Sequence, residues 1–335
     1  MYNESSQTIE QGTTRTPEPL AGSFLYLIVL SLMLASSVFT RQVNIDGDRY
    51  YIFMFLIQLV TIGLPPIAYL ILGKKDIKYS LRLNKASVAE IFLSIGMALF
   101  GYGVIIFINL VWILFLSRFG TPRPASLPAI ENARQFWMAI AVVAAVPALL
   151  EEFLFRGVIQ RGYESFGKIT HIILTGILFA LLHLSIVSVP AIILIGILLC
   201  YIAYRSNSIW ASIAYHFTNN AIAVTLSYIS SIISKLFPAE FDGMSPNFAD
   251  VPPEALRMAV AVWGFIGFFA LLFFGACLAG FHIATRDKQR IRPVDTSINA
   301  GGKFILLIPA ILAVLVIIVL LVFEAIEMVN PTPIM

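Results

Sequence analysis

Nine long apolar runs, separated by short polar connections, dominate this 335-residue chain. A helix needs about 20 largely apolar residues to cross the ~30 Å hydrocarbon layer of a membrane. The sequence predicts helices at about 21–40, 50–72, 88–117, 134–162, 169–187, 189–205, 208–236, 255–284 and 303–326. No strand-type alternation competes with them, and a helix satisfies its own backbone groups in lipid. We therefore expect an all-α fold, a polytopic membrane helix bundle of about nine transmembrane helices.

The composition agrees with a membrane protein and argues against several other classes. Hydrophobic residues make up 59% of the chain and charged residues 12%, whereas soluble domains carry about 25% charged residues. No run of Lys and Arg typical of nucleic-acid binding is present, so we expect the lipid bilayer and not nucleic acid as a partner. Cys200 and Cys277 lie inside apolar runs without C-x-x-C spacing, and we interpret them as packing residues.

The N-terminal 20 residues differ from the rest of the chain. They are polar and carry three glutamates against one arginine. A secretory signal needs a basic start, so residues 1–20 are predicted to form a disordered cytoplasmic tail before a retained first helix. Residues 21–330 are predicted to form a single membrane domain, whose motif-bearing core spans about 134–236.

Basic residues in the connections predict the orientation in a cell membrane. The connections 73–85 and 286–303 each contain five Lys or Arg residues. Cytoplasmic connections are enriched in Lys and Arg, so both are expected in the cytoplasm. With nine spans, this places the N-terminus in the cytoplasm and the C-terminus outside. The connection 118–134 fits least well, because it carries three arginines on the outer side.

A few polar residues lie deep inside the apolar runs and need an explanation: Glu151, Glu152, Arg156, His183, His216, Asn219 and Asn220. A charged side chain in mid-membrane costs a few kcal/mol or more, so it usually faces protein or a water-filled cavity. A rise of 1.5 Å per residue from the predicted inner helix ends places the glutamates and histidines in one layer. This layer lies in the cytoplasmic half of the membrane.

The spacing of these residues gives each helix one polar edge. Glu152 and Arg156 are at i,i+4, the order that favours a helix ion pair. Such a pair leaves Glu151, about 100° around the helix, to face elsewhere. Structural interpretations stay open, because an ion pair can staple two helices and a membrane histidine often bonds a neighbouring helix. Three polar edges at matched depth favour a functional site.

Polar residues near the ends of the runs need no functional explanation. Their side chains can reach the membrane surface while their stems stay in the apolar layer. We expect this of Glu90, Lys235, Glu324 and Glu327, whereas His171 and His282 are expected to lie at the membrane interfaces without a functional role.

A carboxylate and an imidazole can together activate a water for attack on a carbonyl. A second histidine and an asparagine can donate to the oxyanion that forms. Two other hydrolytic signatures, H-E-x-x-H and G-x-S-x-G, are missing from the sequence. A Glu/His/His zinc site stays open from residue types alone, although Asn is a poor fourth ligand.

Three short motifs carry a family resemblance. EEFLFR (151–156) matches EExxxR, FALLH (179–183) matches FxxxH, and HFTNN (216–220) matches HxxxN. In this order and spacing, the chain resembles the CAAX protease and bacteriocin-processing (CPBP or Abi) family of intramembrane endopeptidases, which includes type II CAAX prenyl endopeptidases. The resemblance covers roughly residues 145–225. It implies an eight-helix core, to which this chain adds one helix.

The resemblance also implies catalytic roles. Glu151 would be the general base that activates water, with His183 as its catalytic partner. His216 and Asn220 would form the oxyanion hole. No cofactor is expected under this mechanism, and zinc remains the less favoured alternative.

Three further residues would support this site. Glu152 and Arg156 would orient the catalytic groups, and Phe179 would pack against them. The implied substrate is a prenylated CAAX protein or another small membrane-associated peptide, which reaches the site from the lipid or the cytoplasmic face. Two other functions stay open. One is an ion- or proton-coupled transporter using the same buried groups, which would predict an internal repeat that the sequence lacks. The other is a non-catalytic immunity or scaffold membrane protein.

Overall fold

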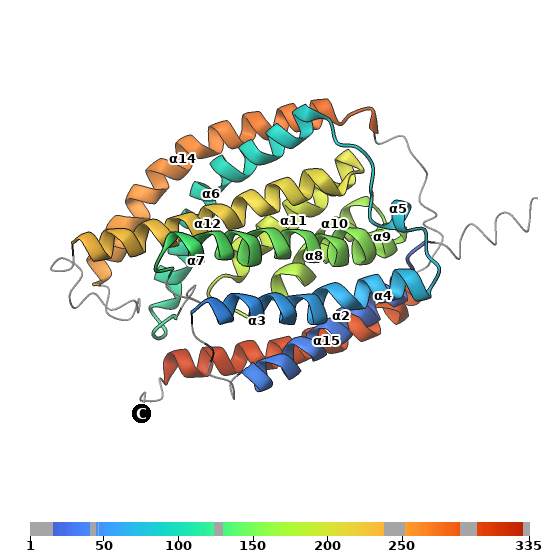
Figure 1. Cartoon of the computed structure of the whole chain (residues 1–335), viewed down its shortest axis with the longest axis horizontal. Coiled ribbons are helices and arrows are strands. Elements are labelled where there is room, and N and C mark those ends of the chain that lie inside the picture. Colours follow the sequence, from blue (N-terminus) through green and yellow to red (C-terminus); the bar gives the residue numbers. More distant parts are fainter. Residues whose placement is uncertain are drawn as a thin grey trace, which may run out of the picture.

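The computed structural model describes residues 16–40, 45, 47–123, 130–237, 252–288 and 300–330. In this part of the chain every regular element is a helix, and the long helices run roughly along one axis of the molecule (Figure 1). The predicted class, an all-α polytopic membrane bundle, is confirmed. Most of the predicted N-terminal tail, residues 1–15, lies outside the described residues.

The first half of the described chain forms long helical segments, several of which change helix type along their length. α2 (Pro19–Thr40) precedes a segment composed of α3 (Asp48–Gln58), η1 (Leu59–Gly63) and α4 (Leu64–Leu72). The single turn α5 (Ile77–Ser80) then leads to α6 (Val88–Leu116). The next segment is continuous and joins α7 (Ala133–Ala139), η2 (Ile140–Ala145), α8 (Val146–Glu152), η3 (Phe153–Ile159), α9 (Gln160–Tyr163) and η4 (Glu164–Phe166).

The second half consists of simpler helices. These are α10 (Lys168–Leu181), α11 (Val189–Ser206), α12 (Ile209–Leu236), α14 (Pro253–Ala284) and α15 (Ala300–Val329). Each of the nine predicted runs therefore contains a helix. In the described part of the chain, however, only seven helical segments are long and apolar enough to span a membrane. α10 has only 14 residues, and α12, which carries the polar residues of HFTNN, is not among the seven.

The fifth predicted helix, 169–187, is too long. α10 ends at Leu181, and His183 lies in the turn that follows. Leu184 has a left-handed backbone with φ of 51°, which stops the helix. The apolar run continues through this turn, so hydrophobicity alone gives no signal for the end of α10.

Three segments have π-helical geometry, with hydrogen bonds that reach one residue further than in an α-helix. Two of them end two residues before a proline: η1 precedes Pro65, and η2 precedes Pro147. Proline lacks an N–H and collides with the preceding turn of a regular helix. A widened turn accommodates this collision without ending the helix. The third, η3, starts immediately after the two glutamates and contains Arg156.

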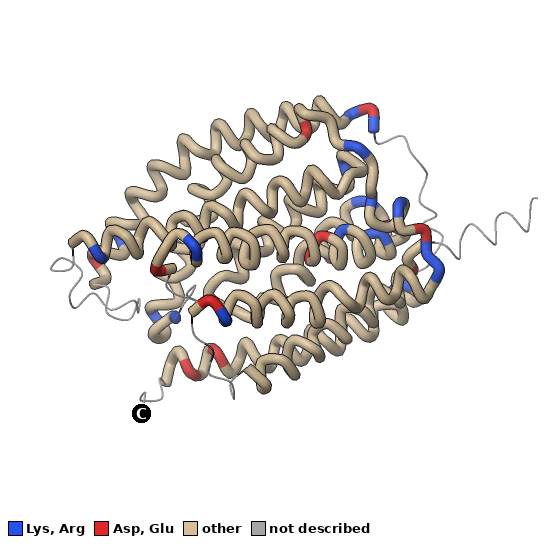
Figure 2. The backbone as a smooth tube through the Cα atoms, viewed as in Figure 1, with Lys and Arg blue, Asp and Glu red and all other residues tan. Residues whose placement is uncertain are grey.

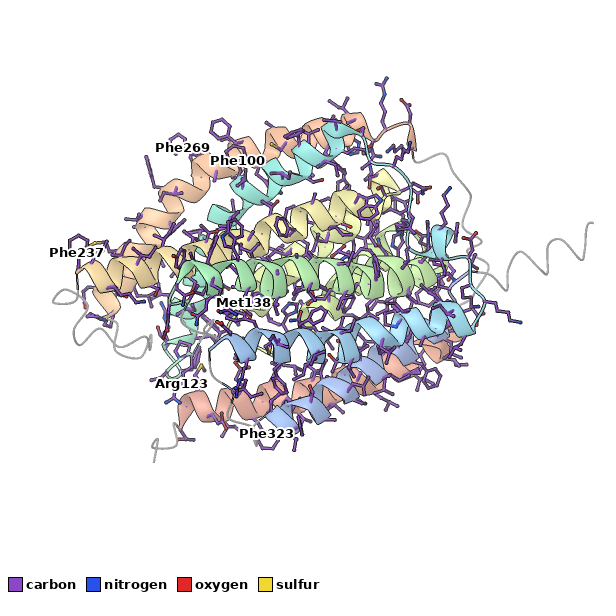
Figure 3. All side chains as sticks on the ribbon, viewed as in Figure 1. Phe100, Arg123, Met138, Phe237, Phe269 and Phe323 are labelled. Carbon is purple, nitrogen blue, oxygen red and sulfur yellow. The ribbon has the colours of Figure 1, made fainter. Side chains whose placement is uncertain are left out.

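The motif-bearing helices lie in the centre of the bundle. α10 and α11 pack against each other as a hairpin, and α12 packs against α6, α8, α11 and η2. α14 covers α6, and α15 covers α2. The outer surface is apolar: the side chains of Phe269 and Phe323 point away from the bundle and are 46% and 60% exposed (Figure 3). Such a surface suits contact with lipid, and the chain is a multi-pass membrane protein.

Charged residues gather mainly at the two ends of the bundle (Figure 2). The largest group of Lys and Arg lies at the end that carries α5. At this end Glu90 was expected to reach water but is buried. It caps the start of α6 by accepting from the Ser87 N–H at 2.9 Å, and it pairs with Lys288 at 2.8 Å. Glu18, within the predicted N-terminal tail, forms an ion pair with Lys75 at 2.8 Å.

Candidate active site

A fully buried ion pair forms the base of the candidate site. Glu152 and Arg156 are 0% exposed, and Arg156 Nη1 lies 2.8 Å from Glu152 Oε1. The i,i+4 ion pair expected from the sequence is therefore present. A buried pair is tolerated only when further hydrogen bonds satisfy its remaining groups. Arg156 meets this need in part by donating from Nη2 to the carbonyl of Gly196 in α11 at 3.3 Å.

His216 of α12 lies between the two glutamates. Its Nδ1 is 3.0 Å from Glu152 Oε1, and its Nε2 is 3.8 Å from Glu151 Oε2. An ionised carboxylate only accepts hydrogen bonds, so Nδ1 carries the proton in this contact. The buried ion pair thus fixes the imidazole and leaves Nε2 as the atom that faces Glu151.

Glu151 is less enclosed than its neighbour. Its side chain is 15% exposed, compared with 0% for Glu152. Its Oε2 is nevertheless buried and, among the described residues, has no hydrogen-bond partner. Buried polar atoms are normally satisfied, and exceptions often belong to functional sites or bind water. The geometry leaves Glu151 free to interact with a water molecule.

Phe179 of α10 joins all three motifs. The Arg156 guanidinium lies 4.4 Å from the centre of the Phe179 ring, in the geometry of a cation–π contact. The rings of His183 and His216 lie 5.0 and 5.8 Å from it, both edge-on. Phe179 is 2% exposed. The three polar edges predicted from the sequence therefore converge on one aromatic ring.

His183 is fixed by its own helix. Its Nδ1 lies 3.0 Å from the carbonyl oxygen of Phe179. Because a carbonyl oxygen can only accept, Nδ1 donates and Nε2 is left for other contacts. The family resemblance implied that His183 is the catalytic partner of Glu151. In the described structure the histidine within 4 Å of Glu151 is instead His216.

Asn220 and Asn219 extend the polar edge of α12. Asn220 Nδ2 donates to the carbonyl of Val143 in η2 at 3.4 Å, and Asn219 Nδ2 donates to Asn220 Oδ1 at 3.4 Å. An amide nitrogen has two hydrogens, so one remains on Asn220 Nδ2 for a further acceptor. Asn220 thus connects α12 to the same continuous helical segment that carries Glu151.

A second charged cluster, which the sequence analysis missed, lies next to Arg156. Arg82 is 1% exposed and donates from Nε to the carbonyl of Arg156 at 3.2 Å. It also pairs with Glu164, which binds Arg161 at 3.2 Å. From the sequence, Arg82 was interpreted only as one of the basic residues of the connection 73–85. The i,i+3 spacing of Arg161 and Glu164 was the one feature of the sequence that could have indicated this cluster.

The remaining histidines lie outside the site. His171 was expected at an interface but is 1% exposed, with its ring 5.0 Å from that of Tyr204. His282 Nδ1 lies 2.7 Å from the hydroxyl of Tyr201. In the described part of the chain, no three His, Cys, Asp or Glu side chains have the arrangement of a metal site. The described side chains therefore provide no set of three ligands for the zinc alternative.

The arrangement is a carboxylate–imidazole site inside a polytopic membrane protein. The family model described as Type II CAAX prenyl endopeptidase Rce1-like matches residues 133–222. This segment covers about a quarter of the chain, starts with α7 and includes all three motifs. The resemblance inferred from the motifs is confirmed, and the family is one of membrane proteases. No curated protein and no solved structure matches the chain.

Proposed function

We propose that the protein is an intramembrane endopeptidase in which Glu151 activates the water that hydrolyses a peptide bond. The convergence of Glu151, Glu152 and His216 beside Phe179 is the observation that carries this proposal. The match of residues 133–222 to a protease family supports it independently. Hydrolysis requires a general base, for which Glu151 is proposed, and a donor to the oxyanion, for which His216 is proposed. The negative charge of Glu152 supports His216.

Glu151 acts as the general base and then as the general acid. It takes a proton from water while the water oxygen attacks the carbonyl carbon of the scissile peptide bond. The carbonyl oxygen becomes an oxyanion. When the C–N bond breaks, Glu151 returns the proton to the leaving nitrogen. The buried and unbonded Oε2 of Glu151 is suited to this exchange.

His216 and Asn220 stabilise the oxyanion. As an imidazolium, His216 donates from Nδ1 to Glu152 and from Nε2 towards the oxyanion. The negative charge of Glu152 fixes the His216 ring and supports its positive charge, and the same carboxylate is paired with Arg156. Asn220 provides a second donor through the amide hydrogen that does not bond Val143.

His183 is proposed as the catalytic partner that contacts the water or the substrate. Its Nδ1 is held by the carbonyl of Phe179, so Nε2 is oriented by the end of α10. His183 and His216 lie against the same Phe179 ring. This common neighbour supports a role for both histidines in one site.

The proposed substrate is a prenylated protein or a small membrane-associated peptide.

A helical rise of 1.5 Å places Glu151 about 22 Å from the end of its segment at Phe166 and about 27 Å from the start at Ala133. The site is thus deep and slightly closer to the end at Phe166. The predicted orientation, with the α5 end in the cytoplasm and the C-terminus outside, makes this the cytoplasmic half.

Cleavage by the purified, reconstituted protein tests the proposal. A farnesylated CAAX peptide and its unprenylated counterpart are incubated with wild type, Glu151→Gln and His183→Ala. The matched control is Glu131→Gln, an exposed glutamate outside the site. We expect cleavage by wild type and the control only. Cleavage by both site variants would sink the proposal, and loss of wild-type activity with a chelator would replace the glutamate mechanism with a metal one.

A further inference from the structure

The turn that carries His183 starts with backbone bonds to α10: the N–H of His183 donates to the carbonyl of Ala180 at 3.1 Å, and that of Leu184 donates to the carbonyl of Leu181 at 3.1 Å. Residues 182–188 connect α10 to α11, and Leu184 within them has a left-handed backbone. Backbone groups at membrane depth must find partners inside the protein, because lipid offers none. Residues beyond these bonds, starting with Ile186, therefore depend on partners from other helices, and these partners hold the far side of the turn that carries His183.

Both backbone polar groups of Ile186, three residues after His183, are held by side chains from other helices. The N–H of Ile186 donates to Glu324 Oε2 of α15 at 2.7 Å. Its carbonyl accepts from Trp112 Nε1 of α6 at 2.8 Å. A bond to a charged acceptor is about twice as strong as a neutral one. Glu324, expected from the sequence only to reach water, thus anchors the turn.

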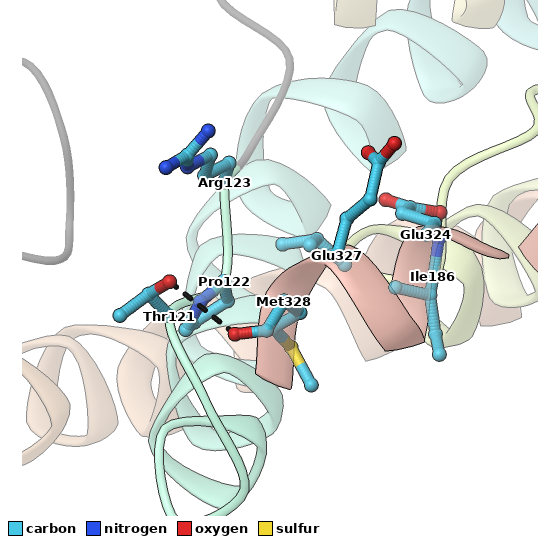
Figure 4. A pocket seen from close by; sticks show the side chains of 8 residues that line it. Thr121, Pro122, Arg123, Ile186, Glu324, Glu327 and Met328 are labelled. Atoms are coloured by element: carbon cyan, nitrogen blue, oxygen red, sulfur yellow. Dashed lines mark hydrogen bonds between the residues drawn. The ribbon is translucent and has the colours of Figure 1, made fainter. Parts of the chain in front are cut away.

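The end of α15 is itself attached to the turn that follows α6. The N–H of Thr121 donates to the carbonyl of Met328 at 2.9 Å. A Cβ at Gly120 would collide with the same carbonyl oxygen, so only glycine permits this approach. Figure 4 shows the result: Glu324 lies against Ile186, and Thr121 is bonded to Met328 on the other side of a pocket of about 60 Å³.

We infer that Glu324 and Trp112 are positioning residues that hold the 182–188 turn and, through it, the ring of His183. This inference rests on the proposed function. Both residues lie outside residues 133–222, the segment matched by the family model. The C-terminal helix α15 therefore contributes to catalysis without touching the substrate. A displacement of about 1 Å at a catalytic group can reduce the rate about 100-fold.

Two measurements on the full-length protein in lipid nanodiscs test the inference. Hydrogen exchange of a short peptide that contains Ile186 reports the protection of the turn, and cleavage of a lipidated peptide gives kcat and KM. The variants are Glu324→Ala, Glu324→Gln and Trp112→Phe. Glu327→Ala is the matched control, because Glu327 lies one turn along and forms no described bond to the turn. Wild type and His183→Ala are measured alongside.

We expect Glu324→Ala to accelerate exchange at Ile186 at least about tenfold and to lower kcat by about 10- to 100-fold, with KM within about twofold. Glu324→Gln keeps an acceptor oxygen, so its exchange and kcat should stay within about threefold of wild type. Trp112→Phe should lower kcat in the same way as Glu324→Ala, and Glu327→Ala should leave both readouts unchanged.

The two hypotheses fail differently. If wild type does not cleave, or His183→Ala cleaves normally, the proposed function is wrong and the inference falls with it. If His183→Ala is inactive but Glu324→Ala keeps the wild-type kcat, only the positioning role is overturned. Equal impairment of Glu324→Gln and Glu324→Ala would also overturn it, because the acceptor oxygen would then be irrelevant. Trp112→Phe keeps the test decisive even if Glu324→Ala fails to fold.

Discussion

Glu152 Oε1 lies 3.0 Å from His216 Nδ1 and also accepts from Arg156 at 2.8 Å. One carboxylate oxygen therefore links the EExxxR motif to the HxxxN motif. The adjacent Glu151 has no such bond on its buried Oε2. The two neighbouring glutamates consequently differ in environment, and the difference leads to opposite expectations for their substitution.

Glu152→Gln is expected to destabilise the protein. It removes the counter-charge of a fully buried arginine, and breaking a buried ion pair on one side costs about 3–5 kcal/mol. Thermal unfolding in detergent measures the loss. Removing both charges with Glu152→Gln and Arg156→Leu should cost less than the sum of the two single substitutions, since no unpaired charge remains. Strict additivity would contradict a direct pair.

Glu151→Gln is expected to abolish cleavage without a comparable loss of stability. The substitution keeps the shape of the side chain but removes the base, which contributes typically 10²–10⁴-fold to a rate. The kcat on a reconstituted peptide should fall at least about 100-fold, while the unfolding temperature stays near that of wild type. A variant that unfolds as easily as Glu152→Gln would instead assign Glu151 a structural role.

The convergence of the candidate site residues could be predicted from sequence because charge is costly in a membrane. EEFLFR, FALLH and HFTNN place ionisable or amide groups inside apolar runs, and such groups must face one another or water. Helical spacing also predicted the pair of Glu152 and Arg156, which depends only on local geometry.

Features set by contacts between distant segments could not be predicted in this way. The end of α10 at Leu181 lies in an apolar run, and its turn is held by Glu324, 138 positions away from Ile186. The burial of Arg82 depends on Glu164 and the carbonyl of Arg156. Neither contact leaves a periodic signal. The sequence also could not show whether His183 or His216 lies next to Glu151, because this depends on the rotation and depth of the helices relative to one another. In the structure the neighbouring histidine is His216.

The crossing of α10 and α11 leads to a prediction about packing. A Cβ on Gly196 would lie 2.5 Å from the carbonyl oxygen of Gly176, and one on Gly176 would lie 2.7 Å from the backbone nitrogen of Ile197. Gly176→Ala and Gly196→Ala should each separate the helices and destabilise the protein by about 1–3 kcal/mol, as expected for overpacking. The measurement is thermal unfolding in detergent.

Gly275→Ala is the matched control for these two substitutions. Gly275 lies in α14, and a Cβ there would meet no atom within 4 Å. Alanine is favoured over glycine in a helix by about 1 kcal/mol, so this variant should be at least as stable as wild type. Similar destabilisation by all three substitutions would argue against a close crossing of α10 and α11.

Asn220→Ala tests the oxyanion hole. Loss of one donor to a developing oxyanion typically reduces kcat by 10²–10³-fold, and the substitution leaves Glu151 and His216 intact. Asn219→Ala is the control, because it removes the amide next along the helix, whose described bond is to Asn220 itself. We expect a fall of about 100-fold in kcat for Asn220→Ala, no large change in KM, and less than about threefold for Asn219→Ala. If the two variants lose activity equally, the amides of α12 act together in packing, and the oxyanion donor must be found elsewhere in the site.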